Sequence, residues 1–110
     1  LKTLQSLISI VTGIDYNLSE LARIGERAFN LGRLFNCQEG LTAKDDTIPS
    51  RFKNQLEGNN PNKGIFSQKM LDSMKRHYYK SRGWEVETGT PMIRKLVDLG
   101  LENYSYCLNE

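Results

Sequence analysis

The 110-residue sequence has few of the residues that metal and catalytic sites need. It contains one histidine, His77, and two cysteines, Cys37 and Cys107, which are far apart and form no CxxC motif. A zinc site or a cysteine-bound iron–sulfur cluster needs more ligands than these. One histidine and no nucleophile-elbow motif also argue against a hydrolytic triad, so we expect a structural or surface role for His77. The two cysteines are expected to be free thiols in a reducing cytoplasm.

Long apolar runs and a strong charge imbalance are also missing. No apolar run is long enough to span a membrane, and residues 1–11 lack the cleavage site of a signal peptide. Fifteen basic residues against thirteen acidic ones give a net charge of +2, a small excess for a protein that binds nucleic acid mainly through phosphates. Because residue 1 is leucine, we expect a chain that is processed or cut from a longer protein.

Apolar residues recur three or four positions apart along several segments, which is typical of helices with one buried face. Residues 1–11 carry the first such face, which Gly13 ends. Asn17 and Glu20 have the spacing of a capping box and predict the start of a long helix. The apolar stripe of this long helix consists of Leu21, Ile24, Ala28, Leu31 and Leu34 or Phe35.

Two further helices are predicted nearer the C-terminus. Ser67 is expected to cap a helix that ends at Gly83. Thr90 as N-cap and Pro91 at the first helical position are expected to begin the last helix, which Gly100 ends. The apolar positions of the helix after Ser67 are Met70, Leu71, Met74 and Tyr78.

The remaining segments indicate connections rather than strands. Residues 41–52 are rich in turn-forming types, and Pro49 disfavours a helix that runs up to it. Residues 57–64, EGNNPNKG, are entirely polar and are expected to form the most exposed loop. No strand-like alternation of useful length and no internal repeat is present. The sequence therefore predicts an all-α fold, one helical domain over residues 1–110, with about four helices and one long irregular connection.

Two glycines interrupt the long helix. Gly25 and Gly32 lie seven positions apart and so almost on one face. Each costs roughly 0.5–1 kcal/mol relative to alanine in a helix interior. We expect them to be explained by close packing of a neighbouring helix against a groove without side chains.

Polar residues form two further patterns. Arg27, Asn30 and Arg33 lie at i, i+3 and i+6 and form a polar stripe alongside the apolar one. Asp45 and Asp46 are an adjacent carboxylate pair, but no EF-hand spacing follows them. Turn or capping chemistry is the interpretation we favour for this pair.

A basic and aromatic segment, MKRHYYKSRGW (74–84), would suit nucleic-acid binding. Helices over 67–82 and 91–99 resemble a helix-turn-helix unit. The link between them is longer than the usual turn and contains Glu85 and Glu87, which would repel phosphates. We therefore expect no nucleic-acid partner, and we interpret Trp84 in this link as a core or interface anchor.

Four segments, in order, resemble the C-terminal end of the tungsten-containing aldehyde ferredoxin oxidoreductases. They are IGERAFNLGRLFNCQEGL (24–41), KDDTIPSRF (44–52), YYKSRGW (78–84) and GTPMIRKLVDLGL (89–101). Each segment is a weak signal alone, whereas all four in the right order and spacing are specific.

The resemblance implies an enzyme that oxidises aldehydes to carboxylic acids. Its tungsten, or molybdenum, would be held by two pterin dithiolenes, and one 4Fe-4S cluster would pass electrons to ferredoxin. The resemblance places the cluster cysteines and the catalytic acid and base upstream of this chain. We therefore assign no catalytic, cofactor-binding or metal-binding residue here, and we expect a structural helical domain that is inactive alone.

The same resemblance makes the rest of the parent polypeptide the expected partner. The polar stripe is expected to pair with carboxylates or carbonyls of neighbouring segments in the whole enzyme, and to face solvent in the isolated chain. Candidate interdomain contacts are Arg27, Asn30, Arg33, Asp45, Asp46 and Trp84. The alternative function is a free-standing helical module that binds a protein partner through Tyr78, Tyr79 and Trp84.

Overall fold

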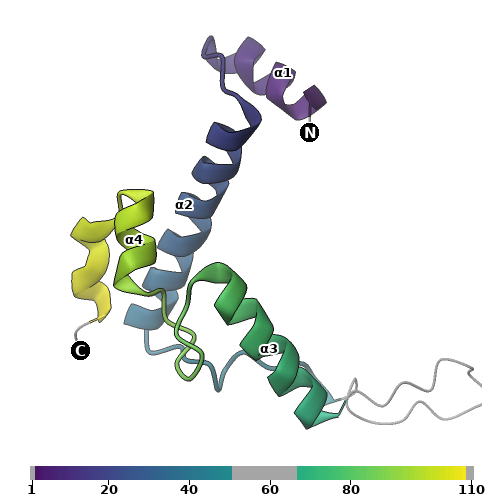
Figure 1. The fold of residues 1–110 in the computed structure, drawn as a ribbon, viewed down its shortest axis with the longest axis vertical. Helices are drawn as coiled ribbons and strands as arrows, with labels where there is room; N and C mark the ends of the chain where they lie inside the picture. The colour runs from purple at the N-terminus through teal and green to yellow at the C-terminus, as the bar shows by residue number, and fades with distance from the viewer. Residues whose placement is uncertain (1, 51–66, 109–110) are drawn as a thin grey trace, which may run out of the picture.

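The computed structural model describes residues 2–50 and 67–108, and these form an all-α fold without strands, as predicted (Figure 1). The polar loop predicted at 57–64 lies outside the described residues. The elements are α1 (Lys2–Thr12), α2 (Leu18–Gln38), α3 (Gln68–Arg82), α4 (Ile93–Leu99) and the 3₁₀ helix η2 (Glu102–Leu108).

The longest helix, α2, begins as the sequence predicts. The side chain of Asn17 accepts a hydrogen bond from the backbone amide of Glu20 at 2.9 Å, and the Glu20 carboxylate accepts one from the Asn17 amide at 2.7 Å. This reciprocal pair satisfies two amide groups that have no partner inside the helix. The capping box is therefore confirmed.

Replacing Asn17 with alanine should destabilise the chain by about 1 kcal/mol, because both hydrogen bonds of the capping box depend on this residue. Urea unfolding followed by circular dichroism measures the loss. Ser19→Ala, at an exposed position two residues after Asn17, is the matched control and should leave the midpoint unchanged. Equal midpoints for the two variants would contradict a stabilising role for the cap.

The main apolar core lies where α2, α4 and η2 meet. Leu34 packs there with Leu96, Leu99 and Leu101, and Leu31 lies against them. Burying such side chains supplies most of the stability of a small domain. This core fixes one face of α2 toward the C-terminal end of the chain.

The last helix begins later than predicted. Its N-cap is Met92, not Thr90, and Pro91 lies before the helix instead of at its first position. Pro91 forms a β-bridge with Trp84, and the amide of Met92 donates to the carbonyl of Gly83 at 3.1 Å. This pairing keeps the backbone before Met92 extended, so tertiary structure overrides the local capping signal.

Helix α3 is joined to the rest of the chain by a few side chains. Within the described residues its backbone does not come close to that of another helix. The predicted apolar face is correct only for Leu71, because Met70, Met74 and Tyr78 are exposed. Tyr79 is buried instead, in a small cluster with Ala43 and Trp84.

The first helix is not packed as predicted. No residue of α1 is buried by the described part of the chain, and its apolar residues Leu4, Leu7 and Val11 are exposed. The helix lies beyond the N-terminal end of α2 (Figure 1). The radius of gyration is 18.3 Å, whereas a compact chain of this length has about 13 Å. The described part of the chain therefore leaves apolar helix surface uncovered.

Candidate functional site

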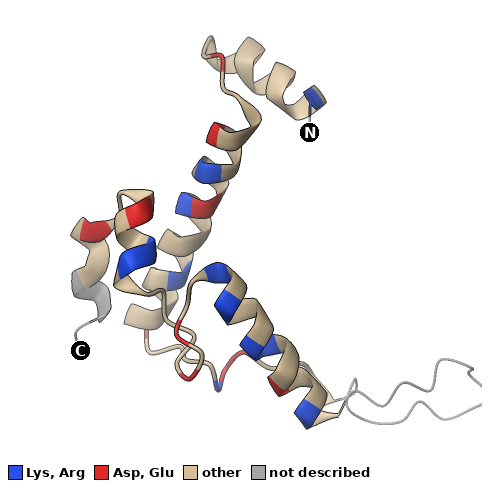
Figure 2. Cartoon of the chain, in the orientation of Figure 1, with Lys and Arg blue, Asp and Glu red and all other residues tan. Residues whose placement is uncertain are grey.

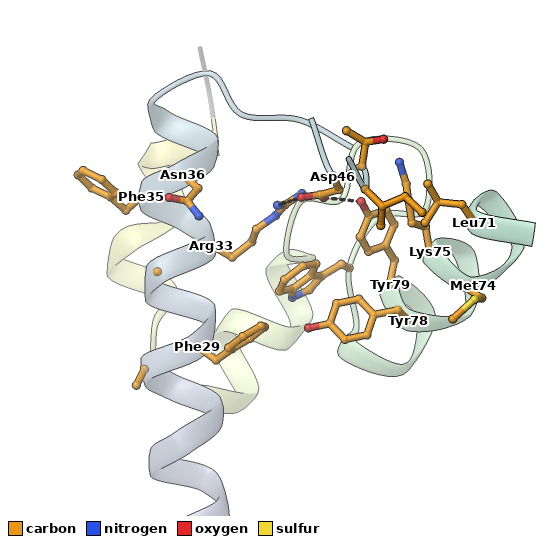
Figure 3. Close-up of a pocket in the computed structure, with 15 residues that line it drawn as sticks. Phe29, Arg33, Phe35, Asn36, Asp46, Leu71, Met74, Lys75, Tyr78 and Tyr79 are labelled. Carbon is orange, nitrogen blue, oxygen red and sulfur yellow. Dashed lines mark hydrogen bonds and ion pairs between the residues drawn. The ribbon is translucent and has the colours of Figure 1, made fainter. Parts of the chain in front are cut away.

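Arg33 is the centre of a buried polar network at the C-terminal half of α2 (Figure 3). Its Nη1 and Nη2 atoms donate to the two carboxylate oxygens of Asp46 at 3.0 and 2.7 Å. Its Nε donates to the carbonyl of Gly89 at 2.8 Å. A bidentate pair of this kind fixes orientation as well as charge. Arg33 thereby joins α2 to the connection after it and to the link before α4.

Tyr79 of α3 completes the pair. Its hydroxyl donates to Asp46 Oδ2 at 2.5 Å. Burial raises the pKa of Asp46, but the hydrogen bonds from Arg33 and Tyr79 outweigh it, so the pKa lies below its usual value. Burial and the bond to Asp46 raise the pKa of Tyr79 well above its usual range. Near neutral pH the network therefore holds an arginine cation, a carboxylate and a neutral phenol.

Gly89 is required at its position in this network. Its φ of 73° is in the left-handed region that L-residues rarely adopt. A Cβ atom there would also collide with the guanidinium of Arg33 and contact the ring of Tyr79. The glycine therefore allows the loop backbone to reach the arginine.

A second polar contact lies beside the first. The indole Nε1 of Trp84 donates to Asn30 Oδ1 at 2.8 Å, and Asn30 Nδ2 donates to the carbonyl of Glu26 at 2.8 Å. The guanidinium of Arg33 lies 5.0 Å from the Trp84 ring centre, within the range of a cation–π interaction. Trp84 is 2% exposed, so the chain itself buries this residue.

The structure therefore corrects two expectations about exposure. Asn30 and Arg33 of the polar stripe are buried inside this chain and paired, although they were expected to face solvent in it. Arg27, the third member, is exposed. The binding surface expected at Tyr78, Tyr79 and Trp84 is also wrong, because Tyr79 and Trp84 are buried.

The two adjacent aspartates have different partners. Asp45 accepts hydrogen bonds from the amide and the hydroxyl of Thr42 at 2.8 and 3.1 Å, and these lower its pKa. This is the turn chemistry expected for the pair. Asp46 instead turns toward Arg33 and Tyr79, so the two carboxylates do not share a cation site.

Glu26 holds three helices together and was not singled out from the sequence. Its carboxylate pairs with Arg82 of α3 at 2.5 Å and with Lys95 of α4 at 3.1 Å. Burial raises the pKa of Glu26, but these two cations outweigh it and lower the pKa overall. Arg82 also lies 4.4 Å from the ring centre of Phe29. These partners are more than fifty positions away in sequence, so no local signal could reveal the pairing.

An apolar groove of about 790 Å³ lies between α2 and α3, next to the arginine network (Figure 3). The α2 wall carries Phe29 and Phe35, and the α3 wall carries Met74 and Tyr78. Phe29 stacks on Trp84 with ring centres 5.8 Å apart. All four groove residues named here are exposed. The groove is thus an open apolar surface with a rigid aromatic base.

Other chemistry has little support in the described residues. Among residues 2–50 and 67–108, no group of three His, Cys, Asp or Glu side chains lies close enough together to hold a metal ion. His77 is exposed, with Nδ1 2.8 Å from the carbonyl of Ser73. Lysine and arginine lie along α3 (Figure 2), but exposed Glu85 and Glu87 lie in the bridged link to α4. None of the helices in the described ranges is both long and apolar enough to cross a membrane.

Comparison with known proteins identifies the family. Residues 1–101 match the family described as "Aldehyde ferredoxin oxidoreductase, domains 2 & 3". The chain is 39% identical over 101 residues to the tungsten-containing aldehyde ferredoxin oxidoreductase of Pyrococcus furiosus, and 37% identical over 101 residues to that of Thermococcus kodakarensis. Each alignment covers 91% of this chain but 16% of the relative. No solved structure matches the chain significantly. The chain belongs to the aldehyde ferredoxin oxidoreductase family.

Proposed function

We propose that the chain is a structural helical domain at the C-terminal end of an aldehyde ferredoxin oxidoreductase. One observation carries this proposal: the segments that resemble the family meet in a single network of structural contacts. Arg33 comes from the first segment, Asp46 from the second, Tyr79 from the third and Gly89 from the fourth. These pairings join segments of the chain to one another, which supports a structural role for the network.

This chain cannot hold a four-cysteine iron–sulfur cluster by itself. An iron–sulfur cluster bound by cysteines needs more thiolates than the two in the sequence, and no other ligand set is gathered in the described residues. We place the tungsten or molybdenum pterin group, the 4Fe-4S cluster and the aldehyde site in the part of the enzyme outside this chain. Ferredoxin as electron acceptor and a cytoplasmic location belong to the same proposal and rest on the resemblance.

A second candidate function is a free-standing helical module that binds a protein. The exposed apolar groove between α2 and α3 favours it, because such surfaces mark interaction sites. The two functions differ in what the groove meets: another part of the same enzyme, or a separate protein.

An exchange of segments tests the proposed function. Residues 1–101 would replace the matching segment of the Pyrococcus furiosus enzyme, and the chimera would be produced anaerobically with tungstate. We expect the chimera to hold as much tungsten and iron per chain as the unmodified enzyme and to reduce a viologen dye with an aldehyde. The 110-residue chain alone should hold neither metal and reduce no dye.

The control is the Pyrococcus enzyme with the matching segment deleted, which should lose the metals and the activity. If the deleted enzyme keeps both, the domain is dispensable and the proposed function is wrong. A chimera that folds without tungsten favours the free-standing module. Stoichiometric iron in the purified 110-residue chain would also overturn the proposal.

A further inference from the structure

Helix α2 has an apolar face turned outward, in addition to the side that packs in the core. The residues on this side share one helical face and are partly or fully exposed: Leu21, Ile24, Gly25, Ala28, Phe29, Gly32 and Phe35. Phe35 is 61% exposed, whereas Arg33 on the other side is 8% exposed. A surface helix normally buries its apolar face and exposes its polar one. Because α2 already buries Leu34 in the main core, the exposed face is a second apolar face, and its exposure indicates that it is covered in the working protein.

Small residues form the middle of this face. Gly25, Ala28 and Gly32 follow one another at spacings of three and four. A Cβ atom added at Gly25 or Gly32 would meet no described atom within 4 Å. Both glycines lie inside regular helix, so a special backbone conformation does not explain them. What they supply is room for a backbone to approach closely.

The facing wall comes from α3. Met74 and Tyr78 line the groove four positions apart and are 53% and 40% exposed. The α3 backbone does not approach that of α2, and the groove separates the two helices (Figure 3). Ala28 and Gly32 of α2 line this groove together with apolar side chains of both helices, so they leave room for an apolar helix to approach closely in ridge-and-groove packing.

We propose that this groove binds an amphipathic helix from the part of the same enzyme that lies outside this chain. The inference rests on the proposed function and names its contact surface. The chain spans 16% of the relatives, so most of such an enzyme is available to supply the helix. The chain's own α1 lies beyond the opposite end of α2, away from the groove (Figure 1). The bound helix would place large apolar side chains over Gly32 and between Phe35 and Met74.

The variant Gly32→Leu distinguishes an effect on binding in the groove from an effect on the stability of the domain. In the free 110-residue chain it should leave the melting temperature unchanged or raise it, because no described atom lies within 4 Å of the added Cβ and leucine favours helix. In the Pyrococcus chimera it should reduce the tungsten-containing, dye-reducing fraction by roughly tenfold, because the leucine fills the helix site. Ser73→Leu, on the exposed side of α3 away from the groove, is the control and should change neither.

A photo-crosslinking amino acid in place of Phe35 then identifies the occupant. Crosslinks from this position in the chimera should map to the Pyrococcus part, whereas the same group in place of exposed Lys80 should give none there. Crosslinks to a second copy or to residues 51–66 would overturn the proposal. So would a Gly32→Leu chimera as active as the unmodified one. If the unmodified chimera itself fails to assemble, the proposed function fails and this inference with it.

Discussion

Replacing Arg33 with methionine should destabilise the chain by about 2–4 kcal/mol, because the change removes one partner of a largely buried ion pair. Methionine keeps much of the apolar volume but supplies no donor. The Asp46 carboxylate and the Gly89 carbonyl then lose hydrogen bonds of 2.7–3.0 Å. The Asp46 side chain is 35% exposed, so water can replace part of its lost hydrogen bonding. The loss of stability should therefore be smaller than for a fully buried ion pair. Urea unfolding of the 110-residue chain measures the change.

The matched control is Arg27→Met in the same helix. Arg27 is exposed, so this variant should unfold within about 0.5 kcal/mol of the unmodified chain. Adding Asp46→Asn to Arg33→Met should recover part of the stability. Without the arginine cation, burying a neutral amide costs less than burying a carboxylate, and the amide oxygen still accepts a hydrogen bond from Tyr79. If the Arg33 and Arg27 variants unfold alike, the network contributes nothing to the fold.

Local signals in the sequence predicted local structure well. The capping box at Asn17 and the left-handed glycines that end α3 and α4, Gly83 and Gly100, depend on contacts within a few residues. The predicted start of α4 was wrong because Trp84 and Pro91 form a bridge across the link between α3 and α4. The capping preference of Thr90 and Pro91 carries no information about this bridge.

The burial pattern of α2 could not be predicted in the same way. Helical periodicity shows that a helix has an apolar side, but it does not say whether this chain or another part of the protein covers that side. The polar side is buried here because Arg33 and Asn30 find partners 56 and 54 positions away, in Gly89 and Trp84. Such pairings are decided by the tertiary fold.

The network residues show the same division. Arg33, Asp46, Asn30 and Trp84 were each singled out from the sequence, but not as partners of one another. Tyr79 was expected at an exposed binding surface and not in the core, because Tyr78, its neighbour, fits the apolar spacing of α3 better. Leu71 and Tyr79, eight positions apart, are the residues of α3 that are buried. The burial of Tyr79 depends on Asp46 and Trp84, which come from other segments of the chain, so the spacing within α3 could not reveal it.

Replacing Trp84 with alanine should have the largest effect on the free chain, about 3–5 kcal/mol, because a buried indole leaves a large cavity. Its ring contacts Phe29, Tyr78 and Tyr79, with ring centres 5.8–5.9 Å away. The indole therefore fills the space between α2 and α3 beneath the groove. Circular dichroism during urea unfolding measures the loss.

Two further variants divide this effect into its parts. Trp84→Phe keeps an aromatic ring but leaves Asn30 Oδ1 without its donor, which should cost about 1–3 kcal/mol. Phe35→Ala removes an exposed ring from the groove wall and should cost the free chain less than about 1 kcal/mol. In the chimera the order should change: Phe35→Ala should become costly, because there its ring is covered. If Phe35→Ala is as harmless in the chimera as in the free chain, Trp84 supports the domain's own fold and the groove above it meets no other part of the enzyme.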